Sequence, residues 1–142
     1  MYGRTKGRRL SKKQKLFLRN HGKDLIFDDG KMEEFLYETF GPKENIFDNK
    51  KVYLEIGFGS GEHLAHKAER HKESKFIGCD YYLNGIASTV IKITEKELSN
   101  VSLFYGDAIK LLDKIPNKSL YEVYLLYPDP WPKVRHLKRR FI

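Results

Sequence analysis

A single carboxylate, Asp129, lies between two prolines in the stretch YPDPWPK, just before Trp131, the only tryptophan of the chain. Proline fixes its own φ and restricts the residue before it, so Asp129 has an extended backbone with little freedom. Its two oxygens can accept N–H donors from a planar base while the indole stacks against the ring. Guanine offers such donors at N1 and at its 2-amino group. Its N7 keeps an available lone pair, so N7 can attack the methyl group of a sulfonium without first losing a proton. A rigid surface turn is the alternative interpretation.

Three further carboxylates, Glu55, Asp80 and Asp107, fall at or just after the ends of three short apolar runs. In an open parallel sheet, ligands bind at the carboxyl ends of the strands. An acid after the second strand suits a ribose diol, and one after the third suits an adenine amine. Each acid could instead cap a helix, and Asp107 before Ala108 suits that role well. Together, three acids at successive strand ends favour a nucleoside site.

The first of these runs continues into glycines, in the stretch EIGFGSG with Gly57, Gly59 and Gly61. Glycine permits the positive φ and the close backbone approach that a strand-to-helix turn needs. A dinucleotide fingerprint would require glycine at position 62, where Glu62 stands, and a carboxylate there opposes a pyrophosphate. The pattern is instead similar to the nucleoside-binding loop of methyltransferases that use S-adenosylmethionine, whose sulfonium cation tolerates nearby acids. A simple tight turn is the alternative.

Strands and helices must alternate to position these residues. Apolar runs predict four strands, and helical periodicity with glycine and proline stops predicts four helices between or before them. Such alternation gives right-handed crossovers and a parallel sheet with helices on both faces. The predicted strands cover residues 52–56, 76–79, 101–105 and 122–127, and the predicted helices cover 32–40, 62–71, 83–98 and 108–115.

The net charge of +8 is concentrated at the two ends of the chain. Residues 1–23 contain nine Lys or Arg and no acid, and residues 133–140 contain five more, whereas the middle is acidic. We predict that residues 1–23 form a flexible basic arm, with a short amphipathic turn around residues 16–18, and that 24–142 form the main domain. A polyanion-binding arm and a solvated basic tail are both compatible with this charge.

Other features of the sequence limit the expected location, membrane association and metal content of the protein. One cysteine, Cys79, excludes an internal disulfide and makes a reducing, cytoplasmic location the expectation. No apolar run approaches the length of a membrane span, so no membrane partner is expected. His63 and His66 share a helical spacing, but no cysteine or acid cluster completes a metal shell, so we expect solvated histidines and no metal.

The stretch PDPWPKVRHLKRR (128–140), with EIGFGSG (55–61), GCD (78–80) and GDA (106–108), resembles the bacterial tRNA (guanine-N7-)-methyltransferases. The resemblance implies a Rossmann-like class I fold that uses S-adenosyl-L-methionine to methylate N7 of guanine 46 in the variable loop of tRNA. It implies that the cofactor is bound by the glycine loop and by Glu55, Asp80, Asp107 and Asp129. Asp80 departs from the family, where glutamate is commoner, so we expect a weaker or shifted ribose contact.

The resemblance also assigns residues to the reaction and to the tRNA. Asp129 maps to the family's proposed active-site residue, and Lys133 maps to a substrate-binding position. The basic block that follows maps to an RNA-contacting segment, where cations would reach phosphates beside an extruded guanine. Its members are Arg135, His136, Lys138, Arg139 and Arg140. We expect this block and the N-terminal arm to clamp the RNA together.

The sequence reaches Ile142 just after the fourth predicted strand, whereas the family continues with further strands. We therefore expect an incomplete methyltransferase domain, truncated after the fourth parallel strand, and we hypothesise that the isolated chain is inactive. An exposed fourth-strand edge would then associate with another chain, or a second chain would supply the missing strands. The rival from another class is a non-catalytic RNA-binding module that retains the nucleoside-binding fold. An NAD-type oxidoreductase half is disfavoured by Glu62.

Overall fold

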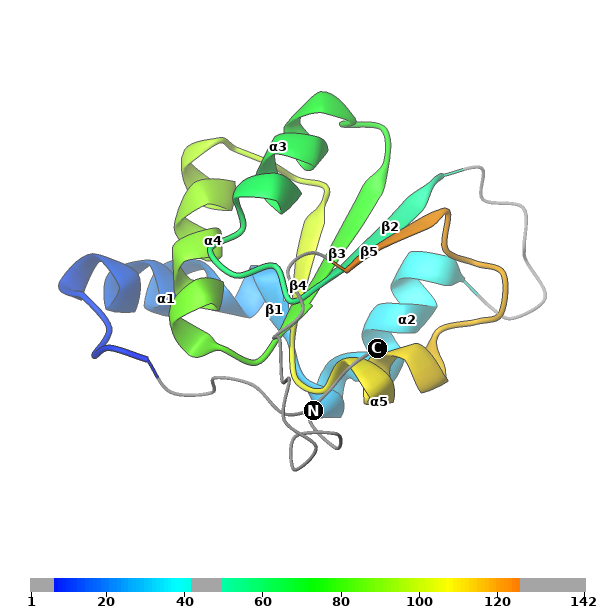
Figure 1. The fold of residues 1–142 in the computed structure, drawn as a ribbon, viewed down its shortest axis with the longest axis horizontal. Coiled ribbons are helices and arrows are strands. Elements are labelled where there is room, and N and C mark those ends of the chain that lie inside the picture. The colour runs from blue at the N-terminus through cyan, green and yellow to red at the C-terminus, as the bar shows by residue number, and fades with distance from the viewer. Residues whose placement is uncertain (1–6, 42–49, 126–142) are drawn as a thin grey trace, which may run out of the picture.

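The computed structural model of this chain describes residues 7–41 and 50–125, in which five parallel strands lie between helices (Figure 1). The strands are β1 (Ile26–Phe27), β2 (Val52–Ile56), β3 (Lys75–Asp80), β4 (Val101–Tyr105) and β5 (Glu122–Leu125). The helices are α1 (Lys12–Leu25), the short 3-10 helix η1 (Asp29–Lys31), α2 (Met32–Phe40), α3 (Glu62–Arg70), α4 (Leu83–Glu95) and α5 (Ala108–Lys114). None of these described helices is both long enough and apolar enough to cross a membrane.

The strands are ordered β1-β4-β3-β2-β5, and every pairing is parallel. The four predicted strands are therefore confirmed as neighbours in the order β4-β3-β2-β5, joined by α3, α4 and α5. This Rossmann-like arrangement brings the carboxyl ends of β2, β3 and β4 to the same edge of the sheet. Within the described part of the chain, β5 forms one border of the sheet and β1 forms the other.

The sheet separates two apolar layers, because successive side chains of a strand point to opposite faces. On β2, Val52, Leu54 and Ile56 pack with α2 and α5 on one face. Tyr53 faces the other way, into a second cluster formed with α3 and α4. Figure 1 shows the same division, with α1, α3 and α4 on one side of the strands and α2 and α5 on the other. Both faces are thus covered, as the sequence predicts for a parallel sheet.

The flexible basic arm predicted for residues 1–23 is wrong for its second half. Residues Lys12–Leu25 form α1, so the proposed domain boundary after residue 23 would cut through a helix. Ser11 begins the helix through a capping box, in which its side chain accepts from the Gln14 N–H and the Gln14 side chain accepts from the Ser11 N–H. Phe17 and Leu18 pack against the cluster formed by α3 and α4, which fixes the helix to the domain. The basic segment is therefore a structural layer of the fold over this range.

Candidate functional site

The loop after β2 is built on left-handed glycines. Gly57 and Gly59 have φ of 70° and 60°, which a residue with a side chain rarely adopts. A Cβ at either position would meet no atom within 4 Å, so the backbone angle, not space, requires glycine there. The Gly57 N–H donates to the Cys79 carbonyl at 2.8 Å, which ties the loop to the end of β3. The expected glycine turn with positive φ between β2 and α3 is confirmed, and its use as a nucleoside-binding loop stays a prediction.

Asp80, the last residue of β3, holds three elements together. Its Oδ2 accepts from the Gly59 N–H at 3.2 Å, and its Oδ1 accepts from the N–H groups of Tyr81 at 2.8 Å and Tyr82 at 3.1 Å. The carboxylate therefore links the glycine loop to the chain entering α4. The sequence pattern predicts a ligand contact for Asp80, but it does not indicate that Asp80 links the glycine loop to the chain entering α4.

We expect the replacement of Asp80 by alanine to reduce the free energy of unfolding by about 1–3 kcal/mol, because three backbone donors lose a charged acceptor. Urea denaturation followed by circular dichroism measures the loss. Asp107→Ala is the matched control, since that carboxylate accepts from the Ile109 N–H at 2.9 Å as the cap of α5. Loss of a cap typically costs about 1 kcal/mol. An Asp80→Ala loss no larger than that of Asp107→Ala would contradict the linking role.

Asp107 follows β4 at the position next to Asp80 across the sheet. Asp80 pairs with Tyr105, and the Gly106 N–H donates to the Asp80 carbonyl at 3.2 Å. Although partial burial acts in the opposite direction, the Ile109 N–H and the nearby Lys110 cation help to hold the pKa of Asp107 below its ordinary value. The carboxylate is therefore an anion at neutral pH. The helix-cap interpretation of Asp107 is confirmed, and a ligand contact at the same group stays a prediction.

Glu55 differs from the other two acids because it is buried, with 2% of its surface exposed. It lies opposite Gly78 of β3 and Tyr124 of β5 in the sheet. Its Oε1 is 3.1 Å from Nδ1 of His63 on α3. Its Oε2 is buried and has no hydrogen-bond partner within residues 7–41 and 50–125. Burial raises the pKa of Glu55, and the neighbouring His63 opposes the rise. A buried carboxylate oxygen without a donor is costly, so the group needs a partner from outside the described residues or from a ligand.

His63 is a residue whose partner the sequence analysis missed. The expectation of a simply solvated histidine is wrong, because His63 contacts Glu55 and packs edge-on against the Tyr124 ring, with centroids 5.0 Å apart. His66, on the same helix, is exposed as expected. Across residues 7–41 and 50–125, no three His, Cys, Asp or Glu side chains are grouped closely enough to hold a metal ion.

The structure thus brings three of the predicted site residues to the ends of three adjacent strands. Glu55 belongs to β2, Asp80 ends β3, and Asp107 follows β4. Gly57, Gly59 and Gly61 lie in the turn between β2 and α3. The other predicted site residues lie outside the described part of the chain, so their positions stay predictions. They are Asp129, Lys133, Arg135, His136, Lys138, Arg139 and Arg140.

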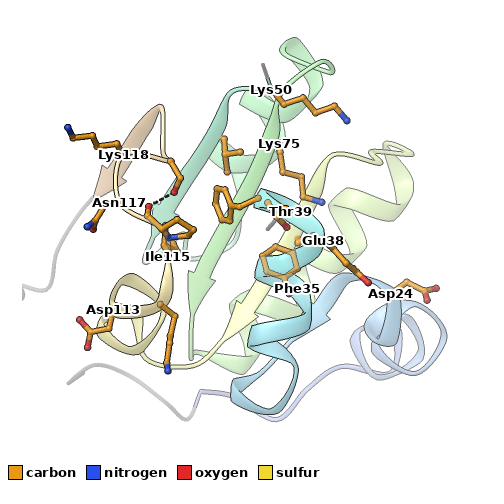
Figure 2. A pocket seen from close by; sticks show the side chains of 17 residues that line it. Asp24, Phe35, Glu38, Thr39, Lys50, Lys75, Asp113, Ile115, Asn117 and Lys118 are labelled. Carbon is orange, nitrogen blue, oxygen red and sulfur yellow. Dashed lines mark hydrogen bonds between the residues drawn. The ribbon is translucent and has the colours of Figure 1, made fainter. Parts of the chain in front are cut away.

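A cavity of about 900 Å³ lies at the other end of the strands. Its lining includes Val52, Lys75 and Ser102, which stand at or near the starts of β2, β3 and β4. Figure 2 shows Lys75 extending toward Thr39 of α2, with Phe35 below it. The cavity is therefore separate from the acids, which lie at the carboxyl edge of the same sheet.

Comparison with known proteins agrees with this architecture. A family described as "Putative methyltransferase" matches residues 49–142. A protein of Roseobacter denitrificans named tRNA (guanine-N(7)-)-methyltransferase is 38% identical over 151 residues, covering 99% of this chain and 60% of its own length. Relatives with the same name from Paracoccus denitrificans and Rhodopseudomonas palustris strain BisB18 are 40% and 43% identical, with 61% and 55% of their lengths covered. This chain thus spans somewhat more than half the length of these curated relatives. From the matched residues and the parallel α/β fold, the chain belongs to the putative methyltransferase family.

Proposed function

We propose that this chain carries the cofactor half of an enzyme that transfers a methyl group from S-adenosyl-L-methionine to N7 of guanine 46 in the variable loop of tRNA. Membership in a methyltransferase family supports the reaction class. The names of the relatives support the substrate, because each is called a tRNA (guanine-N(7)-)-methyltransferase. The rival proposal, a non-catalytic RNA-binding module, predicts no cofactor binding.

The observation that carries the proposal is the buried Oε2 of Glu55 near the end of β2, just before the glycine loop, which has no hydrogen-bond partner in the described part of the chain. A cationic or N–H-bearing ligand at this edge would satisfy that oxygen, and S-adenosylmethionine offers both a sulfonium and an ammonium group. Asp80 and Asp107 add two carboxylates for hydroxyl or amine donors, and the left-handed glycines keep side chains out of the loop. The described residues therefore fit this cofactor. We propose Glu55, Gly57, Gly59, Gly61, Asp80, Asp107 and Asp129 as its binding residues.

The protein's chemical task in this reaction is alignment. The cofactor supplies an electrophilic methyl group when it is bound. Guanine N7 carries a lone pair, so no base is needed before attack, and the rate gain comes from fixing the purine in the attacking geometry. We propose that Asp129 accepts N–H donors of the guanine and that the basic block contacts the flanking phosphates. That block consists of Lys133, Arg135, His136, Lys138, Arg139 and Arg140.

The direct test incubates the purified chain with methyl-labelled cofactor and an unmodified tRNA transcript, followed by nuclease digestion and detection of 7-methylguanosine. Because the isolated chain is hypothesised to be inactive, we expect no label above a heat-killed control; label at guanine 46, absent from a transcript with adenine at that position, would overturn the hypothesis of inactivity and support the proposed reaction. In a chain that does transfer methyl groups, we expect Asp129→Asn to reduce incorporation by about 100-fold or more, since removal of one donor or acceptor aligned in a transition state costs roughly that much.

Calorimetry with S-adenosylmethionine separates the proposal from its rival. Binding without methyl transfer would support the hypothesis that residues 24–142 are an incomplete domain. Absence of both binding and transfer in a chain that folds would overturn the proposed function and favour the RNA-binding module.

A further inference from the structure

The exposed face of α1 carries a row of four cations. Lys12, Lys15, Arg19 and Lys23 are separated by three, four and four residues, and all four are exposed. Residues three and four apart on a helix lie on the same face. The row therefore forms one stripe that runs for roughly 16 Å, at a rise of 1.5 Å per residue. We call these four residues the α1 stripe.

The cations of the α1 stripe have no acidic partner among the described residues, whereas three other exposed lysines do. Lys13, one position away, pairs with Glu95 of α4 at 2.8 Å. Lys96 pairs with Glu69 at 2.9 Å, and Lys110 pairs with Asp29 at 3.3 Å. A solvated helix face usually mixes charges of both signs, with acids four residues from bases. The α1 stripe contains only positive charge, which favours an anionic partner.

The opposite face of α1 is already occupied, which argues against a membrane as that partner. Phe17, Leu18 and Leu25 pack against the apolar cluster of α3 and α4. The Gln14 side chain also donates to the Ser88 hydroxyl of α4 at 3.1 Å. A helix that lies in a lipid interface inserts its apolar face, and α1 has that face buried in the protein. The α1 stripe is therefore a rigid array of cations suited to a regular line of phosphates.

The start of α1 is connected to the carboxyl edge of the sheet, where the acids lie. The Asn84 side-chain amide, in the first turn of α4, donates to the Arg8 carbonyl at 2.5 Å. Asn84 follows Tyr81 and Tyr82, whose N–H groups donate to Asp80. Figure 1 shows this N-terminal stretch leading into α1 beside α4. An RNA strand on the α1 stripe would lie on the α4 side of the domain, and the segment before α1 connects that side to the carboxyl edge.

We propose that the α1 stripe is a docking surface for the phosphate backbone of RNA, formed by Lys12, Lys15, Arg19 and Lys23. This inference rests on the proposed function for the choice of tRNA as the ligand. Because α1 is a helix packed on the domain and not a flexible arm, its backbone is already ordered. The four cations can therefore contact phosphates without the cost of ordering that backbone.

The test measures binding of a fluorescein-labelled tRNA transcript to the full 142-residue chain by anisotropy, without cofactor, from 50 to 200 mM KCl. One variant replaces Lys12, Lys15, Arg19 and Lys23 with glutamine. Its matched control replaces Lys50, Arg70, Lys72 and Lys114, which are also three lysines and one arginine, all exposed and near the amino edge of the sheet. We expect the stripe variant to weaken binding by about tenfold or more and to reduce the salt slope by about 2–3, and the control to shift affinity less than about threefold.

A charge-conserving variant, with Lys12, Lys15 and Lys23 changed to arginine, is expected to bind tRNA like the parent. Circular dichroism spectra that match the parent would show that the variants fold. Equal weakening by the stripe variant and its control would overturn the proposal, as would absence of salt-dependent tRNA binding by the parent. Stripe-dependent binding to phosphatidylserine vesicles but not to tRNA would overturn it in favour of a membrane surface. Failure of cofactor binding would leave this result intact, since no cofactor is present in the assay.

Discussion

Replacing Glu55 with glutamine is expected to raise the stability of the chain at pH 7 while weakening its binding of S-adenosylmethionine by about tenfold or more. The carboxylate is buried, and its Oε2 has no partner among the residues that the structure describes, so the cofactor-free protein bears the cost of an incompletely satisfied charge. Glutamine removes that charge at similar volume, and we expect a gain of about 1 kcal/mol, which corresponds to roughly 3 °C in Tm. The same change removes a charged hydrogen-bond acceptor for the cofactor, which is worth about 1.5–3 kcal/mol.

The pH dependence of this stability difference gives a second check. The folded-state pKa of Glu55 is raised, mainly by burial, above the ordinary value of 4.5. The parent therefore loses stability as the pH rises from below 4.5 through the folded pKa, because the folded chain resists ionisation. The advantage of Glu55→Gln should vanish below about pH 4 and grow as the pH rises through the folded pKa of Glu55.

Glu62→Gln is the matched control, since Glu62 is exposed in the first turn of the same helix that carries His63. Thermal melts from pH 3.5 to 7.5 measure the stability of both variants, and calorimetry measures the cofactor. A Glu55→Gln protein that is less stable than its parent at pH 7 would contradict the claim that the buried, incompletely hydrogen-bonded Glu55 carboxylate destabilises the chain. Unchanged cofactor affinity would contradict the binding role.

Replacing Gly85 with alanine is expected to lower the free energy of unfolding by about 1–3 kcal/mol and to weaken cofactor binding. Gly85 lies in the first part of α4, and an added Cβ would collide with the backbone carbonyl of Gly59. A backbone group cannot swing aside as a long side chain can, so the glycine loop or the helix must shift. That shift would also disturb the Gly59 N–H that donates to Asp80. Chemical denaturation and calorimetry test the two effects.

Gly22→Ala in α1 is a control for which we expect no loss of stability. There the new Cβ would meet only Cδ1 of Ile26, at 3.7 Å, which is an ordinary contact. Alanine is favoured over glycine in a helix by up to about 1 kcal/mol, so this variant should be as stable as the parent or slightly more stable. If both alanine variants were equally stable, the close approach of α4 to the glycine loop would be unimportant for the fold.

The central sheet could be predicted because its strands are short apolar runs that end in glycine or in an acid. Parallel strands buried on both faces must be apolar almost throughout, and residues 52–56 and 101–105 show that pattern. The end of a strand locates its acid without any tertiary information. The sequence alone was therefore enough to predict that Glu55, Asp80 and Asp107 lie at the carboxyl edge of the sheet.

The N-terminal elements could not be predicted in the same way. The cations of α1 obscured its apolar face, although Ser11 and Gln14 have the spacing of a capping box, a signal that was available in the sequence. Strand β1 has only two residues, and its pairing with Leu103 and Phe104 is set by tertiary contacts. The contact between Glu55 and His63 likewise depends on how α3 packs, which no local pattern encodes.

The pairing of β1 with β4 has a consequence for the order of folding. Ile26 lies beside Leu103, so this border of the sheet joins segments that are far apart along the chain. During synthesis, β1 emerges from the ribosome early and cannot pair until β4 has been translated. Contacts of such long sequence separation slow folding, because the intervening loop must close first. The nascent chain would thus expose the apolar side of α1 until α4 and β4 are made, which makes this interval the stage at which a chaperone would be most useful.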